Sequence, residues 1–283
     1  MSRDNFFYKN IPNFFTLMNL LSGAIAIVLT FEGRNNLALA SYFIYIAGVF
    51  DFFDGFAART LKATSSIGKE LDSLADMISF GVAPSMIIYQ LLKYSLQIKQ
   101  FSFSLPISDI LILLSALLIA VFSAIRLAKF NVDTRQTESF LGLATPACAM
   151  LIASIPLIAE FNPIDKLILF PDISRNIYFF LGLVLFEAFI VKPFFLVPLV
   201  ILLSALLVME IPMFSMKFKN LSFEDNRLKF YFLITSFLFF ISIQVLAIPL
   251  IFILYITFSF FDNILNKRLK KRTDENLDKL FIE

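Results

Sequence analysis

Long apolar runs constrain this chain more than any other feature. A helix crosses the hydrocarbon core of a bilayer with about 17–25 mostly apolar residues. The sequence contains eight windows close to that length, at roughly 12–31, 38–58, 72–92, 107–129, 144–160, 193–211, 229–246 and 248–263. Composition agrees, because 59% of the residues are hydrophobic and only 16% are charged, against about 45–50% and about 25% in soluble domains. We therefore expect an all-α polytopic membrane protein with about eight transmembrane helices.

Scarce residue types exclude several kinds of function. A net charge of +2 is too small to indicate nucleic-acid binding. The absence of histidine excludes His-dependent catalytic triads and zinc sites with His ligands, and it leaves carboxylates as metal ligands and bases. The single cysteine, Cys148, cannot form an intrachain disulfide, and its apolar surroundings predict a small buried core residue.

Basic residues indicate the orientation, because Lys and Arg gather on the cytoplasmic side of membrane proteins. With eight spans and a cytoplasmic N-terminus, most of the 24 Lys and Arg residues lie on the cytoplasmic side. The six on the other side are Arg34, Lys93, Lys99, Lys166, Arg175 and Lys192. An extra span over the apolar stretch 177–191 would move the basic loop 216–230 outside. We therefore predict an interfacial or re-entrant segment over 177–191.

Two features of the C-terminal part concern its organisation. The long apolar run 230–262 holds Pro249 near its centre, which marks either a hairpin or a kink. The last residues, 266–283, are rich in Lys and Arg, as expected beside anionic lipid headgroups. We predict one membrane-embedded domain over 1–265 followed by a basic cytoplasmic tail.

Four carboxylates cluster where the second and third windows meet the cytoplasm: Asp51, Asp54, Asp72 and Asp76. Ionised groups in a membrane are costly and usually mark function. Residues three or four apart share a helix face, so each pair projects together, and a short hairpin can bring the pairs face to face. Their mutual repulsion favours divalent cations, and all-oxygen ligation suits Mg²⁺, Mn²⁺ or Ca²⁺. Four carboxylates suffice for two ions, an arrangement typical of phosphoryl chemistry.

The residues between these aspartates fit the same chemistry. Gly55, Ala58 and Gly68 have little or no side chain, so a ligand can approach the backbone closely. Arg59 lies one turn beyond the first acidic pair, and a guanidinium binds phosphate through two hydrogen bonds. Ordinary interfacial charges paired with nearby cations would explain one aspartate at a helix end, but not four at matched spacing.

The acidic stretch reads Asp51-x2-Asp54-Gly55-x2-Ala58-Arg59-x8-Gly68-x3-Asp72-x3-Asp76. This pattern resembles the complete signature of the CDP-alcohol phosphatidyltransferases, and the resemblance extends over about 10–265, most weakly over 160–195. It implies a six-helix membrane core with extra C-terminal helices, usually in a homodimer. It also implies transfer of a phosphatidyl group from CDP-diacylglycerol to an alcohol, with release of CMP.

The resemblance implies roles for individual residues. The four aspartates would hold two divalent ions, commonly Mg²⁺ or Mn²⁺, and Asp76 would also be the general base on the incoming hydroxyl. The CDP-diacylglycerol headgroup would bind at Asn13, Thr16, Gly55, Ala58, Arg59 and Gly68. Family members of this kind lie in the bacterial inner membrane, here with the active site at the cytoplasmic face.

Further segments resemble the branch of the family that uses L-serine as the acceptor: Ile11–Asn19, Phe80–Ser85, Arg126–Asn131 and Gly142–Ala147. That branch more often has Arg where this chain has Lys129. After the fourth window, cationic side chains could bind the serine carboxylate and a neighbouring amide could add a hydrogen bond. These acceptor-binding candidates are Arg126, Lys129, Arg135 and Asn131.

Two alternatives remain open at this stage. The same chemistry could use glycerol 3-phosphate or inositol phosphate, although their dianionic phosphates call for more basic residues near the site. An acidic cluster in a membrane is also typical of a cation channel or transporter. However, these aspartates lie at one interface rather than along a pore, and conduction does not explain the Gly-x2-Ala-Arg motif.

Overall fold

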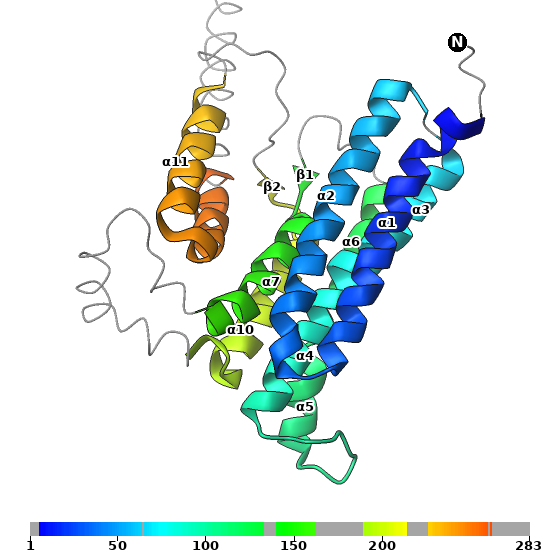
Figure 1. The fold of residues 1–283 in the computed structure, drawn as a ribbon. Helices are drawn as coiled ribbons and strands as arrows, with labels where there is room; N and C mark the ends of the chain where they lie inside the picture. Colours follow the sequence, from blue (N-terminus) through cyan, green and yellow to red (C-terminus); the bar gives the residue numbers. More distant parts are fainter. Residues whose placement is uncertain are drawn as a thin grey trace, which may run out of the picture.

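The computed structural model describes residues 6–63, 65–132, 140–161, 189–213, 226–259 and 261, and these residues are almost entirely helical (Figure 1). The α-helices are α1 (Phe6–Phe31), α2 (Leu37–Leu61), α3 (Ser66–Asp76), α4 (Ala83–Ser95), α5 (Ile107–Ser115), α6 (Leu118–Val132), α7 (Thr145–Phe161), α10 (Pro193–Val208) and α11 (Arg227–Ile243). Helix also covers 247–259. Short turns of helix form η1 (Arg34–Asn36), η2 (Met77–Val82) and η4 (Gln244–Leu246), and the two-residue strands β1 (Phe140–Leu141) and β2 (Pro212–Met213) pair antiparallel.

The helices confirm the prediction of an all-α polytopic membrane protein. Among the described residues, five helical segments are long and apolar enough, by length and composition, to cross a bilayer: Asn10–Phe31, Arg34–Leu61, Ser66–Ser95, Ile107–Val132 and Arg227–Ser259. Two shorter apolar helices cover Thr145–Ala159 and Pro193–Val208. Large apolar side chains are exposed along the outer faces of these helices, for example Val28 and Val49, as expected for surfaces in contact with lipid.

The segment Arg227–Ser259 folds back on itself instead of forming one straight helix. The Phe232 ring lies 6.1 Å from the ring of Tyr255 and 5.9 Å from that of Phe258, whereas a straight helix would separate residues 232 and 255 by about 35 Å. Gln244, with φ of 48°, marks the turn between the two arms. The apolar run therefore forms a hairpin, which we call the C-terminal hairpin (227–259), rather than a kinked helix.

The first four spans build the part of the bundle that holds the acidic cluster. Helix α1 packs along α2 and against α3, η2 and α4, while α6 packs against η2 and α10. The approach of α1 to η2 is so close that a Cβ on Gly23 would overlap Ser79. Ser79 donates a hydrogen bond of 2.9 Å to the Asn19 carbonyl. The six-residue π-helical turn η2 starts directly after Asp76, and π turns in helices are frequent at functional sites.

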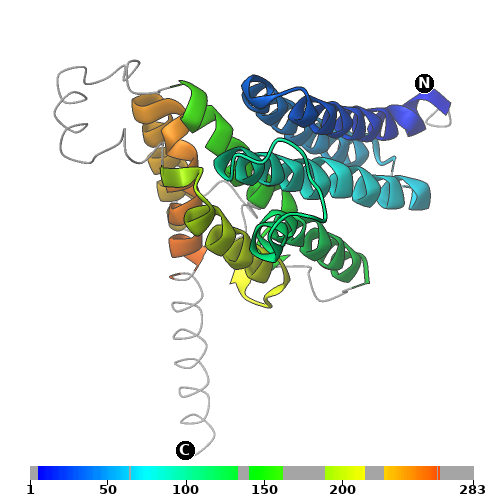
Figure 2. The same cartoon turned by 90° about the horizontal axis from the view of Figure 1, so that it is seen from below.

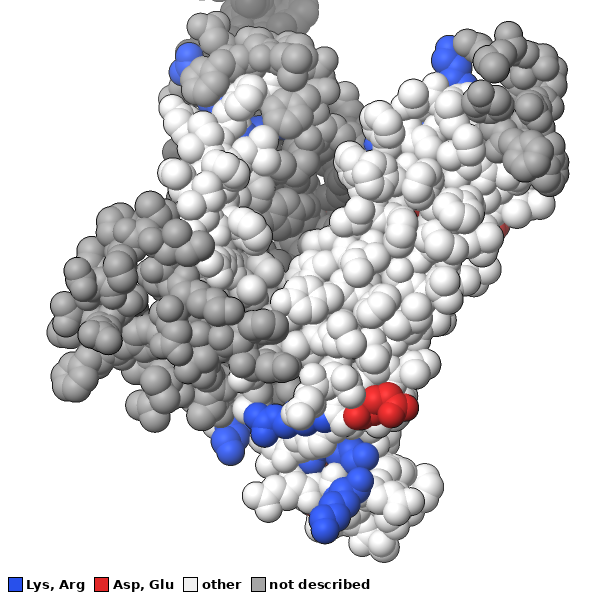
Figure 3. Space-filling model, viewed as in Figure 1, with Lys and Arg blue, Asp and Glu red and all other residues white. Residues whose placement is uncertain are grey.

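Charge lies at the two ends of the bundle. Figure 3 shows a broad surface without Lys, Arg, Asp or Glu between basic and acidic side chains at the lower end and basic side chains at the upper end. Such a belt suits the hydrocarbon core of a membrane. Cys148 is fully buried, which confirms its predicted place in the core. Most of the predicted interfacial segment 177–191 and the whole basic tail 266–283 lie outside the described residues.

Candidate active site

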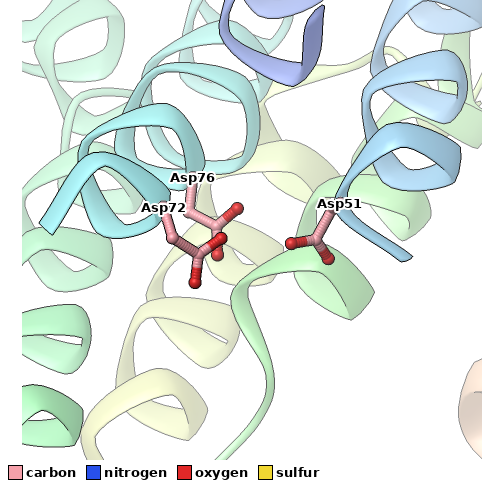
Figure 4. Close-up of side chains that lie close together, drawn as sticks. All are labelled: Asp51, Asp72 and Asp76. Carbon is pink, nitrogen blue, oxygen red and sulfur yellow. The ribbon is translucent and has the colours of Figure 1, made fainter. Parts of the chain in front are cut away.

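Three of the four predicted carboxylates converge. Asp51 lies in the last three turns of α2, and Asp72 and Asp76 lie one turn apart on α3. Each offers one carboxylate oxygen, and these oxygens lie within 4.8 Å of one another. Figure 4 shows Asp72 and Asp76 side by side on one helix, facing Asp51 on the other. The helical spacing of the sequence and the packing of α1 against both helices together produce this arrangement.

The fourth carboxylate, Asp54, lies beside this cluster but outside the group of three. Its side chain is only 6% exposed, and it accepts a hydrogen bond of 2.9 Å from the hydroxyl of Thr16. Asp54 and Asp72 both line one pocket. The structure therefore brings all four predicted aspartates to one region, with Asp54 on the side that faces Thr16.

The acidic cluster has the chemistry of a divalent cation site. Carboxylate oxygens that share one Mg²⁺, Mn²⁺ or Ca²⁺ lie about 3–5 Å apart, given bond lengths of about 2.1–2.6 Å. One oxygen of Asp72 is buried with no hydrogen-bond partner among the described residues. An orphaned oxygen beside two further carboxylates is costly unless a cation compensates it. The residues present therefore fit a divalent metal, with Asp51, Asp72 and Asp76 as the nearest ligands.

Sequence reasoning assigned no role to Asn19, which contacts the site directly. Its side chain is fully buried, and its amide donates a hydrogen bond of 3.1 Å to one oxygen of Asp76. Asn13, Thr16 and Asn19 recur every three residues on α1, so they face the same neighbours. A polar stripe on an otherwise apolar helix could have revealed this role. Asn19 fixes the orientation of the Asp76 carboxylate.

A pocket of about 220 Å³ opens beside the carboxylates. Its walls come from the N-terminal part of α1, the last turns of α2, the connection to α3 and the start of α3. The lining residues are Pro12, Asn13, Thr16, Asp54, Gly55, Ala58, Ala63, Ser65, Gly68, Lys69 and Asp72. Five of the six residues predicted to bind the headgroup of CDP-diacylglycerol are among them. The sixth, Arg59, is exposed and lies next to Gly55, with its guanidinium 4.0 Å from where a Cβ there would be.

The predicted acceptor-binding residues take different positions. Arg126 on α6 is only 9% exposed. Its guanidinium donates to the Thr145 hydroxyl at 3.4 Å and lies within electrostatic range of Asp76. Lys129 is exposed, and Arg135 lies outside the described residues. Arg126 is therefore a buried cation whose guanidinium is within electrostatic range of one of the carboxylates.

Asn131 joins α6 to α3. Its amide donates to the Ser73 hydroxyl at 2.9 Å, and its carbonyl accepts a hydrogen bond of 3.0 Å from the Lys69 ammonium. Asp72 lies between Ser73 and Lys69 along the chain, so these bonds help to hold α3 in place. Sequence reasoning predicted Asn131 as a ligand for the acceptor and missed its link to Ser73.

Comparison with known proteins identifies the family to which this chain belongs. A model of the CDP-alcohol phosphatidyltransferase family matches residues 9–190, which is more than half of the chain. The chain belongs to this family. The match includes the acidic cluster and the pocket beside it, so both belong to a transferase of phospholipid biosynthesis that is integral to the membrane.

Curated relatives are similar over about half of this chain. A CDP-diacylglycerol–serine O-phosphatidyltransferase from Bacillus subtilis is 36% identical over 154 residues, which cover 54% of this chain and 78% of that protein. One of the same name from Helicobacter pylori is 36% identical over 143 residues, 50% of this chain and only 54% of that protein. An archaetidylserine synthase from Methanothermobacter thermautotrophicus is 32% identical over 157 residues, 55% of this chain and 61% of that protein.

Proposed function

We propose that this CDP-alcohol phosphatidyltransferase transfers the phosphatidyl group of CDP-diacylglycerol to the hydroxyl of L-serine, giving phosphatidylserine and CMP. The observation that carries the choice of acceptor is the position of Arg126. Arg126 is a buried cation on α6, which packs against η2 directly after Asp76, so the carboxylate of serine can bind the guanidinium while the serine hydroxyl faces the aspartate. The relatives from Bacillus and Helicobacter carry the name of serine phosphatidyltransferases, which supports the same acceptor.

In the proposed reaction the serine oxygen forms a bond to the phosphorus that carries the diacylglycerol. The bond from that phosphorus to the bridging oxygen of the diphosphate breaks, and CMP leaves with the electron pair. Asp76 accepts the hydroxyl proton, and Asn19 keeps its carboxylate in position. A serine hydroxyl is a weak nucleophile at neutral pH, so a positioned base accelerates the step.

The acidic cluster would hold two divalent ions, Mg²⁺ or Mn²⁺, through Asp51, Asp54, Asp72 and Asp76. When bound, such ions would neutralise the negative charge on the diphosphate and on the departing CMP. The separation of the three converging oxygens, within 4.8 Å, and the orphaned oxygen of Asp72 support this assignment.

The pocket beside the cluster would receive the cytidine nucleotide and its diphosphate. Gly55, Ala58 and Gly68 leave room for the ligand, while Asn13 and Thr16 offer polar groups from α1. Arg59, at the edge of the pocket, would bind a phosphate oxygen. The acyl chains would remain in lipid alongside the exposed apolar faces of the first helices.

On the acceptor side we propose Arg126 as the principal ligand of the serine carboxylate. We propose Lys129 and Arg135 as further acceptor-binding cations, and Asn131 would contribute mainly through its bonds to α3. We further propose a homodimer in the bacterial cytoplasmic membrane, with the active site facing the cytoplasm. The distribution of basic residues along the sequence supports this orientation.

Gly68 provides a test of the nucleotide pocket. A Cβ at this position would lie 2.9 Å from the Ser65 hydroxyl and 3.0 Å from the side-chain oxygen of Asn13, while Ser65 accepts the Gly68 amide hydrogen at 2.9 Å. We expect Gly68→Ala to raise the KM for CDP-diacylglycerol about tenfold, because both neighbours must shift within the pocket and a contact worth about 1.4 kcal/mol changes affinity tenfold. Steady-state assays with varied CDP-diacylglycerol measure this effect. Ser66→Ala, on the same turn but exposed, is the control, and an unchanged KM in Gly68→Ala would argue against the pocket.

The proposed function is tested by incubating membranes that contain the protein with CDP-diacylglycerol, labelled L-serine and Mg²⁺ or Mn²⁺. We expect CMP release and labelled phosphatidylserine in equal amounts, both abolished by a chelator and restored by the metal. Glycerol 3-phosphate and inositol phosphate are added in competition. Preferential use of either would overturn serine as the acceptor, and absence of metal-dependent CMP release with every alcohol would overturn the proposal as a whole.

A further inference from the structure

The C-terminal hairpin lies beyond the part of the chain that matches the family, which ends at residue 190. It nevertheless contacts the bundle, because η4 packs against α7 and four of its side chains pack against the buried core: Val245, Leu246, Phe252 and Tyr255. Figure 2 shows its two helices beside α7. The hairpin is thus a docked part of the protein and can contribute side chains to its interior.

Two contacts link the hairpin to the surroundings of Arg126. Arg126 donates to Thr145, the first residue of α7, and η4 of the hairpin packs against the same helix. Tyr255 packs against the buried core, and its ring lies 6.1 Å from that of Phe232 on the other arm.

The hydrogen-bond donors of the Arg126 guanidinium are not all satisfied within the described residues. Its side chain is more than nine-tenths buried, and its Nε has no hydrogen-bond partner among the described residues. Its contact with Thr145 is long, at 3.4 Å. The phenol of Tyr255 lies within electrostatic range of the same guanidinium, and Ser259, one turn on, holds the Tyr255 carbonyl with a hydrogen bond of 2.8 Å. A buried guanidinium with a free donor calls for an anionic ligand.

We propose that Tyr255 of the C-terminal hairpin is an acceptor-binding residue, which donates a hydrogen bond from its phenol to the serine carboxylate held by Arg126. The inference rests on the proposed function and deepens it. A phenol adds a donor without adding charge, so it strengthens binding of the carboxylate without repelling the ammonium group of serine. The hairpin would thereby close the acceptor side of the site from beyond the residues that match the family.

The test uses the full-length protein and the variant Tyr255→Phe, which keeps the ring and its contact with Phe232 but removes the hydroxyl. We expect the KM for serine to rise about tenfold, as for the loss of one hydrogen bond to a charged group. The kcat at saturating serine and the KM for CDP-diacylglycerol should stay within about threefold of the wild type, since neither depends on this bond. A preserved KM for CDP-diacylglycerol also shows that the variant is folded.

Tyr231→Phe is the matched control, because Tyr231 lies on the other arm of the hairpin with its side chain about half exposed. Combining Tyr255→Phe with Arg126→Lys should raise the KM for serine by less than the product of the two single effects, because both side chains would bind one carboxylate. An unchanged KM for serine in Tyr255→Phe, or a fall in kcat alone, overturns the inference while the proposed function stands. A wild-type protein that does not use serine overturns both.

Discussion

Replacing Asp76 with Asn is expected to lower the rate of CMP release at least about 1,000-fold. The substitution removes the proposed base, and general base catalysis alone contributes about 100- to 10,000-fold. It also removes one negative charge from a cluster whose three oxygens lie within 4.8 Å of one another, which would weaken cation binding. The rate is measured as release of labelled CMP at saturating serine and CDP-diacylglycerol.

Two further variants, Asp72→Asn and Asp109→Asn, are needed to interpret this result. Asp72→Asn changes the carboxylate one turn away, and we expect an equally severe loss that high metal concentrations partly restore, because Asp72 would act only as a ligand. Asp109→Asn makes the same chemical change on α5, where the carboxylate accepts a hydrogen bond from Ser108 and has no contact with the cluster. Full activity in either Asp72→Asn or Asp76→Asn would contradict the proposed chemistry, provided that Asp109→Asn is also active.

Replacing Arg126 with Ala is expected to raise the KM for serine by about 10- to 150-fold, which corresponds to about 1.5–3 kcal/mol for a hydrogen bond to a charged group. The physical reason is that the guanidinium is buried and lies within electrostatic range of Asp76. The KM for CDP-diacylglycerol should change little, because Arg126 does not line the nucleotide pocket. Initial rates over a range of serine concentrations measure the effect.

Arg34→Ala is the control for this second prediction, since it removes an exposed arginine from η1, in the connection between α1 and α2. Arg126→Lys keeps the charge but loses the planar fork of donors, and we expect an intermediate KM. If Arg126→Ala left the serine kinetics unchanged while CDP-diacylglycerol still bound, the carboxylate of the acceptor would have to lie elsewhere, and Lys129 would be the next candidate.

Much of the fold was predictable because its determinants are local. Apolar windows of sufficient length located the membrane helices, since a bilayer demands about 20 apolar residues of any helix that crosses it. The pairing of Asp72 with Asp76 followed from the helical period alone. The sequence did not decide whether the apolar run 230–262 forms a hairpin or a kinked helix, because Pro249 permits both. The ring contacts of Phe232 with the opposite arm were needed to decide it.

The candidate site was predictable only in part. The motif identified all four aspartates, but only the packing of α1 separates Asp54, bound to Thr16, from the three that converge. Asn19 lies far from the motif in the sequence, so its hydrogen bond to Asp76 was missed. Asn131 was predicted as an acceptor ligand from its place after the fourth apolar window, and only the tertiary structure shows that its amide bonds to Ser73.

The sequence by itself determined that this chain crosses a membrane repeatedly and carries paired carboxylates at a helix interface, because hydrophobicity and helical periodicity act over neighbouring residues. Only the tertiary structure decided which carboxylates converge, which amide orients Asp76 and which distant helix the hairpin packs against. Those contacts depend on how each helix is rotated about its axis and how closely its neighbour packs. The overlap that Gly23 avoids at Ser79 and the π turn η2 set these quantities, and both arise when the helices come together.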